Sequence, residues 1–202
     1  MSYSNDVNIH IETLTGGIPD PECSAMKAIA NELDSRLKFL AGEPESPNTR
    51  VAERDARRLA KESTTSMLAA AELRLGPAIE KAHAELIAPP VVKDHNDRFR
   101  LDHILRSLPP DLDPLTVSAA WNTYPAEVQT ALLSAPPMMR KKGKEMRVVD
   151  LVELPFREKV MRVQRPDAGR KFDGLSSALE KIQLVGGFFK TSLKSSPALV
   201  GG

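Results

Sequence analysis

Basic side chains gather in the last third of the chain, where they could hold phosphate groups. From Arg140 to Lys171 there are 11 Lys and Arg residues against 5 Asp and Glu residues. Such a stretch can neutralise several phosphates of a nucleic acid and gain affinity by releasing counterions. The residues that we expect on the phosphates stand at its beginning: Arg140, Lys141, Lys142, Lys144 and Arg147.

Aromatic side chains that would stack on bases are scarce around this stretch. Phe156 and Phe172 are nearby, and the single tryptophan, Trp121, lies outside it. No helix-turn-helix pattern with a recognition helix is visible either. Binding to nucleic acid would therefore have no sequence preference. The alternative, which we favour, is a solvated basic face or a contact with acidic helices of another subunit.

Two histidines with aspartates beside them have the residue types of a metal site but not its spacing. His95 and His103 stand eight residues apart, which on a helix is about 12 Å. That distance is too long for both imidazoles to bind one ion without a further segment. We therefore predict no metal site and interpret both histidines as surface or helix-cap residues.

The usual constellations of catalytic residues are missing from the sequence. There is no G-x-S-x-G turn for a serine nucleophile, and the single cysteine, Cys23, has no base near it in sequence. No G-x-x-x-x-G-K-[ST] loop is present to hold nucleotide phosphates. We expect no catalytic residues, no cofactor and no enzymatic activity.

The composition predicts an all-α fold. The chain has 202 residues, of which 41% are hydrophobic, 27% are charged and only 4% are aromatic. The core must therefore be aliphatic, which favours packed helices over a β-sandwich rich in aromatic and β-branched residues. We expect an irregular multi-helix bundle with one long Ala-rich helix and an extended N-terminal arm, and a small β-hairpin near 146–165 stays open as an alternative there.

The N-terminal residues 1–20 are predicted to form the extended arm. Val7, Ile9 and Ile11 alternate with polar residues, as in a short strand. From Pro21 onward apolar residues recur at helical spacing as far as Leu40.

The clearest helical pattern runs from Thr49 to Ala88 and contains Gly76-Pro77. Proline removes a backbone donor and clashes with the preceding turn, so we expect one helix to end near Leu75 and another to begin at Pro77. A stripe of small side chains on this segment would let another helix approach closely. The candidate contact residues lie on this stripe and at a later double-proline joint: Ala52, Ala56, Leu59, Met67, Ala70, Met138 and Met139.

Prolines set the predicted boundaries of the following helices, because the residue before a proline avoids the helical conformation. For 146–165 two interpretations stay open: a helix kinked at Pro155, which we prefer, or two strands that meet near it. Gly186-Gly187 should weaken the middle of the last helix. The other helices are expected at about 97–108, 114–122, 125–133 and 173–193.

Charge divides the chain into unlike parts. Residues 1–135 carry 14 Lys and Arg against 20 Asp and Glu, a net charge of −6, whereas residues 136–202 carry 14 against 7, a net charge of +7. We predict three parts: the arm 1–20, an acidic helical domain 21–135, and a basic C-terminal helical segment 136–202. Acidic and basic parts of neighbouring copies could pair head to tail and build a ring or a filament.

Two phrases, FRLDHILRSLPP and VQTALLSAPPMM, pair a short helix ending in L-x-x-L-P-P with one ending in A-x-L-x-A-P-P. Over about residues 98–140 the chain thereby resembles uncharacterised helical proteins of bacterial and bacteriophage genomes. The resemblance implies an all-α fold and a phage or prophage origin, and it implies no reaction. The chain departs from the pattern at RKKGK, where a Leu-rich turn is expected.

These features predict a non-enzymatic structural or assembly protein, with a phage virion component as the narrower expectation. Its partner would be itself or another structural protein, bound through helices. The alternative is a nonspecific nucleic-acid-binding accessory or regulatory protein that uses residues 140–171, and a third hypothesis is an inhibitor or adaptor of one host protein. The sequence has neither a membrane-spanning stretch nor a signal-peptide pattern. We therefore expect no membrane partner, a cytoplasmic location where the protein is made, and incorporation into a virion if the narrower expectation holds.

Overall fold

The fold is all-α, as predicted, in a computed structural model of the chain. The structure describes residues 2–13, 20–109, 112–134, 139–141, 144–146 and 152–193. Two compact units are present: the first comprises Met1–Lys81 and Lys171–Gly202, and the second comprises Ala82–Arg170. The boundary that charge suggests, between residues 135 and 136, falls inside the second unit, so the structural division does not follow the charge division.

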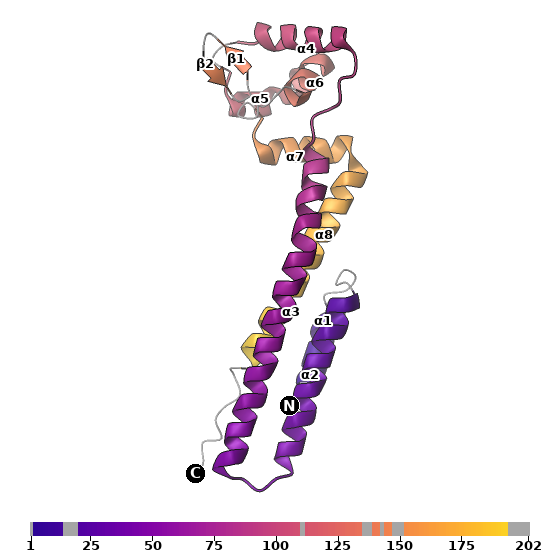
Figure 1. Cartoon of the computed structure of the whole chain (residues 1–202). Coiled ribbons are helices and arrows are strands. Elements are labelled where there is room, and N and C mark those ends of the chain that lie inside the picture. The colour runs from indigo at the N-terminus through magenta and orange to yellow at the C-terminus, as the bar shows by residue number, and fades with distance from the viewer. Residues whose placement is uncertain are drawn as a thin grey trace. The chain divides into compact units, whose positions relative to one another are not determined.

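The first unit packs four helices around one core among the residues that the structure describes (Figure 1). They are α1 (Tyr3–Thr13), α2 (Asp20–Ala41), most of α3 (Pro47–Ile87) and most of α8 (Pro166–Ser192). Helices α2 and α3 run antiparallel and are joined by the short connection 42–46. The buried side chains of the shared core are Tyr3, Val7, Met26, Ala30, Leu33, Ala56, Ala60, Val185, Phe189 and Leu193.

The expected extended arm is wrong, because residues 3–13 form helix α1. Val7 and Ile11 are four residues apart, a spacing that places both side chains on one face of a helix as well as on one face of a strand. Val7 is buried and Ile11 packs against the same core, whereas Ile9 between them is 50% exposed. The alternating apolar residues therefore include a pair at helical spacing, and only this pair, Val7 and Ile11, contacts the core.

Asp34 of α2 holds the beginning of α1. Its carboxylate accepts hydrogen bonds from the backbone N–H groups of Tyr3 at 2.9 Å and Ser4 at 2.8 Å, and from the Ser2 hydroxyl at 2.8 Å. The first N–H groups of a helix have no acceptor within the helix, and the Asp34 carboxylate is the acceptor for two of them. Burial alone would raise the pKa of Asp34, but the hydrogen bonds from Ser4, Ser2 and Tyr3 together lower it below its ordinary value.

Helix α3 continues through Gly76-Pro77, so the predicted break near Leu75 is wrong. Pro77 cannot donate to the carbonyl four residues earlier, which costs the helix one hydrogen bond. Buried side chains on both sides of the proline lie at spacings of four, seven and four residues, which keeps them on one helix face. Packing on this face holds the helix together where local propensity would end it. The buried residues are Ala71, Leu75, Ala82 and Leu86.

Helix α8 is likewise continuous across Gly186-Gly187, although the sequence predicts weakness there. Gly186 is buried against Leu68 of α3: a Cβ atom at this position would lie 2.7 Å from Leu68 Cδ2 and 3.1 Å from Cγ. Real Cβ atoms do not come this close to another carbon. A side chain at position 186 would therefore require the Leu68 side chain to shift, whereas a Cβ at Gly187 would meet nothing within 4 Å.

The second unit is built from short helices and one minimal hairpin (Figure 1). The predictions at 97–108, 114–122 and 125–133 are confirmed to within a few residues. Asp113 caps the start of α5, since its carboxylate accepts hydrogen bonds from the Thr116 backbone N–H at 3.0 Å and from the Thr116 hydroxyl at 2.6 Å. The elements are α4 (His95–Ser107), α5 (Pro114–Ala120), the 3-10 helix η1 (Trp121–Thr123), α6 (Ala126–Ser134), β1 (Met139–Lys141), β2 (Lys144–Met146) and α7 (Leu154–Gln164).

The hairpin predicted near 146–165 is wrong. Residues 154–164 form helix α7, and Pro155 lies in its first turn, where its missing N–H has no partner to lose. Arg157 and Met161 of α7 are buried four residues apart, on one face of this helix. The antiparallel pair β1–β2 occupies an earlier stretch, with Arg140 paired to Glu145 in register.

We predict opposite effects of alanine at the two adjacent glycines of α8. Gly187→Ala should raise the free energy of unfolding by about 0.5–1 kcal/mol, because alanine favours the helix and meets open space. Gly186→Ala should lower it by about 1 kcal/mol, because Leu68 must move out of its packing. Urea unfolding followed by circular dichroism measures both. Equal effects of the two substitutions would contradict the close approach of α8 to α3.

We also predict that acid weakens the attachment of α1. Asp34→Ala should lower the free energy of unfolding at pH 6 by about 0.5–2 kcal/mol, as loss of a helix cap does. Because the folded-state pKa of Asp34 is lowered, the contribution is complete above the ordinary value of 3.8 and is lost as the pH falls through the folded-state pKa. Urea unfolding of both proteins should therefore show a smaller difference at pH 2.5 than at pH 6. An undiminished difference would show that the charge of Asp34 contributes nothing.

Candidate interaction surface

An open groove runs between α2 and α3 in the first unit. Its main hollow has a volume of about 570 Å³, and a second, smaller hollow continues along the same two helices toward Ile29 and Ser63. We call the main hollow the α2–α3 groove. Its lining residues are Ser35, Arg36, Phe39, Leu40, Ala52, Asp55, Ala56 and Leu59.

A large apolar side chain stands exposed beside small ones in this groove. Phe39 of α2 is 71% exposed and Leu59 of α3 is 42% exposed. Ala52 is half-buried and Ala56 is buried, and neither has a side chain long enough to fill the space between the helices. An exposed aromatic residue next to an unfilled apolar groove is typical of a surface that binds another protein.

The edges of the groove carry both signs of charge in pairs that lie on the surface. On α2, Arg36 pairs with Glu32 at 2.6 Å. On α3, Arg58 pairs with Asp55 at 3.3 Å. Exposed pairs of this kind contribute little to stability, so they can exchange partners readily. With two positive and two negative side chains, these edges have no net charge to attract a polyanion.

The structure brings three of the predicted contact residues together in the groove: Ala52, Ala56 and Leu59. It separates the others. Met67 packs against the core of the first unit and Ala70 is exposed elsewhere on α3. Met138 lies outside the described residues, and Met139 belongs to β1.

Phe39 and Leu40 are the groove residues that the sequence interpretation missed. The core stripe of α2 is carried by Met26, Ala30 and Leu33, which are buried. Phe39 lies six residues beyond Leu33, off this stripe, near the end of the helix. A large apolar residue outside the core stripe was the signal that could have identified an exposed contact residue.

Three of the predicted phosphate-contacting residues lie in the hairpin. Arg140 and Lys141 belong to β1 and Lys144 belongs to β2. Lys142 and Arg147 lie outside the described residues. The structure thus places three of the five within a few residues of one another along two paired strands.

Arginines farther along the basic segment bind protein atoms instead. Arg157 of α7 is only 6% exposed. Its guanidinium donates to the Ile87 carbonyl at 3.2 Å and to the Leu133 carbonyl at 2.7 Å, at the C-terminal ends of α3 and α6. The last carbonyls of a helix have no partner within the helix and carry partial negative charge, which suits a buried cation. Burial lowers the pKa of Arg157, and the nearby charge of Arg165 adds to this effect.

Two further arginines of this segment have acceptors nearby. Arg165 donates to the Glu85 carbonyl at 3.0 Å, near the end of α3. Arg162 reaches Glu158 at 3.4 Å, and the same carboxylate binds His83 Nε2 at 2.7 Å. Basic side chains of the second unit therefore stabilise helix ends and ion pairs, which the sequence does not distinguish from a solvated face.

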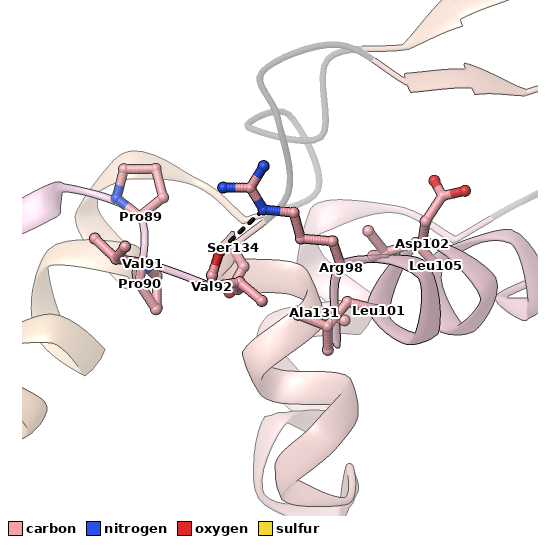
Figure 2. A pocket seen from close by; sticks show the side chains of 10 residues that line it. All are labelled: Pro89, Pro90, Val91, Val92, Arg98, Leu101, Asp102, Leu105, Ala131 and Ser134. Atoms are coloured by element: carbon pink, nitrogen blue, oxygen red, sulfur yellow. Dashed lines mark hydrogen bonds between the residues drawn. The ribbon is translucent and has the colours of Figure 1, made fainter. Parts of the chain in front are cut away.

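A second hollow of about 570 Å³ lies in the second unit, between the linker at 89–92, α4 and α6 (Figure 2). Its walls are mostly apolar. The Nε of Arg98 in its wall donates to the Val92 carbonyl at 2.9 Å. Ser134 Oγ is buried without a hydrogen-bond partner among the described residues. Its described lining holds no His or Cys and one carboxylate, Asp102, so it offers no paired groups for acid–base chemistry.

Other chemistry has little support in the described residues. No group of three or more His, Cys, Asp or Glu side chains there is placed to hold a metal ion. His95 and His103 are both exposed on α4. No described helix has the length and apolar character needed to cross a membrane.

We predict that the buried guanidinium is important for the second unit. Arg157→Met should lower the free energy of unfolding by about 2–4 kcal/mol, because it leaves two buried helix-end carbonyls without donors. Trp121 reports on the change, since its ring packs edge-on against Phe156 with centroids 5.4 Å apart. Urea unfolding followed by Trp121 fluorescence is the measurement.

The matched control for this variant is Arg170→Met. Arg170 pairs with Asp167 on the surface, where the two side chains are 76% and 93% exposed. Its loss should change the free energy of unfolding by less than about 0.5 kcal/mol. If the two variants were equally stable, Arg157 would have no such role.

No family model, curated protein or solved structure that was compared with this chain matches it.

Proposed function

We propose that this protein is a non-enzymatic structural or assembly protein that acts through helix-mediated contacts with copies of itself or with another structural protein. The observation that supports this proposal is the α2–α3 groove, with Phe39 71% exposed beside Ala52 and Ala56. Leaving such an apolar ring in water is unfavourable, and a protein partner that covers it would gain the free energy of its burial.

Charge distribution supports a protein partner over a nucleic acid at the groove. Its edges combine Arg36 and Arg58 with Glu32 and Asp55, and a polyanion requires an excess of positive charge. The resemblance to helical proteins of phage genomes makes a virion the particle in which such a subunit would first be sought.

Nonspecific nucleic-acid binding through residues 140–171 remains the alternative function. Fewer of its positive charges are available than the sequence suggests, because Arg157, Arg162 and Arg165 have carbonyl or carboxylate acceptors nearby. The positive charges between Arg140 and Arg147, together with the exposed Lys159 and Arg170, are then the ones that would have to bind phosphates.

Light scattering after size-exclusion chromatography distinguishes the two functions. The full chain is run at about 50 mM and about 500 mM salt, with and without a DNA duplex of arbitrary sequence. We expect an oligomer that persists at high salt and does not shift with DNA, because apolar contacts are insensitive to salt.

The opposite result would be a monomer that joins the duplex at low salt and leaves it at high salt. Phosphate contacts behave in this way, since each one releases counterions. That outcome would overturn the assembly function and direct mutagenesis to Arg140 and its basic neighbours.

A further inference from the structure

We propose, building on the proposed function, that the partner in the α2–α3 groove is a second copy of this chain. The two copies are related by a two-fold axis that runs along the groove. Helix α2 of each copy lies on α3 of the other, and the four helices form one antiparallel bundle. Phe39 packs against Ala52 of the second copy, and Arg36 pairs with Asp55 of the second copy.

The register follows from the positions of these residues along the groove. Phe39 and Arg36 line the hollow from α2, and Ala52 and Asp55 line it from α3. Because the helices are antiparallel, the three-residue step back from Phe39 to Arg36 matches the step forward from Ala52 to Asp55. A two-fold axis along the groove places α2 of the second copy on α3 of the first, and it leaves every residue at the same height along the helices. Each residue therefore meets the residue that faces it across the groove in its own chain.

The apolar part of this contact fits a large side chain to a small one. Phe39 is 71% exposed and projects from the surface that also contains the half-buried Ala52. An interface with two-fold symmetry requires a projection and its recess on the same patch, because that patch must be complementary to itself. An aromatic ring placed in a recess near the centre of an interface is also where binding energy concentrates.

Charge complementarity favours the same occupant. Arg36 and Asp55 have opposite signs, and their side chains are 49% and 50% exposed in their present pairs with Glu32 and Arg58. Both can therefore turn to a second copy without breaking a buried ion pair. The symmetric contact makes this pairing twice, once on each side of the axis.

Exchanging these charges tests the pairing directly, by sedimentation or light scattering of the full chain at low salt. Arg36→Asp alone places two carboxylates together at both contacts, and Asp55→Arg alone places two guanidinium groups together. Each variant alone should self-associate at least about tenfold more weakly than the unmodified chain. A mixture of the two restores both attractive contacts, so it should associate to within about threefold of the unmodified chain. Any effect of a substitution within its own chain is the same in the mixture as in the single variant. Recovery of association in the mixture is therefore expected only if Arg36 and Asp55 of different copies are in contact.

Phe39→Ser tests the apolar contact, and Leu73→Ser is its matched control. Leu73 is 79% exposed on α3 and does not line the groove. Phe39→Ser should weaken self-association by about a hundredfold, whereas Leu73→Ser should leave it within about threefold. Thermal unfolding of both variants checks that the fold is retained.

The outcomes separate this inference from the broader function. If the chain associates but neither Phe39→Ser nor the charge-exchanged mixture behaves as described, the assembly function stands and the two-fold groove contact is overturned. If the unmodified chain is monomeric at all concentrations, the two-fold groove contact is overturned, and the assembly function then requires another structural protein as the partner. Recovery in the mixture together with loss in Phe39→Ser supports the second copy as the occupant.

Discussion

The uninterrupted course of α3 is the constraint on which the rest of the structure depends. This helix of 41 residues contributes side chains to both compact units and runs without a break through Pro77, which lies in the first unit. It keeps a single buried face from Ala71 to Leu86 although the proline costs a hydrogen bond. At its end, Arg157 and Arg165 bind carbonyls that the helix itself leaves without donors. Tertiary packing and a capping cation thus overcome the local preference of Gly76-Pro77 to end a helix.

Close helix packing explains why small residues matter on α3 and α8. Ala56 and Ala60 lie in the core that the four helices share, and at Gly186 a Cβ atom would displace the Leu68 side chain from its packing. Next to this core, Ala52 and Ala56 of α3 line the α2–α3 groove, where small side chains leave space instead of a close contact. A small side chain on a helix can therefore accompany either a close helix contact or an open groove, and the positions of the neighbouring helices decide which one forms.

The sequence predicts well the features that local chemistry controls. Prolines mark the helices of the second unit, and the Ala-rich pattern predicts helix on both sides of Pro77. Three residues of its stripe, Ala52, Ala56 and Leu59, line one groove. The prediction from sequence fails where a helix and a strand would place the same residues on one face, as with Val7 and Ile11 of α1, which are four residues apart. It also fails where distant packing decides, as at Pro77 and Gly186. The exposure of Phe39 also depends on distant packing, because the position of α3 determines it. The arginines of α7 were interpreted as one basic surface because a sequence does not show which carbonyls lie within reach.

The two charged contacts that hold helix ends differ in their chemistry. Asp34 binds the N–H groups of α1 through a carboxylate, which takes up a proton in acid. Arg157 binds Ile87 and Leu133 through carbonyl oxygens, which do not titrate in water. Acid can therefore release a helix start in one unit while this helix-end contact in the other stays intact. Because Tyr3 and Val7 hold α1 in the core as well, acid should loosen the start of α1 without detaching the helix, while the Arg157 contact stays formed.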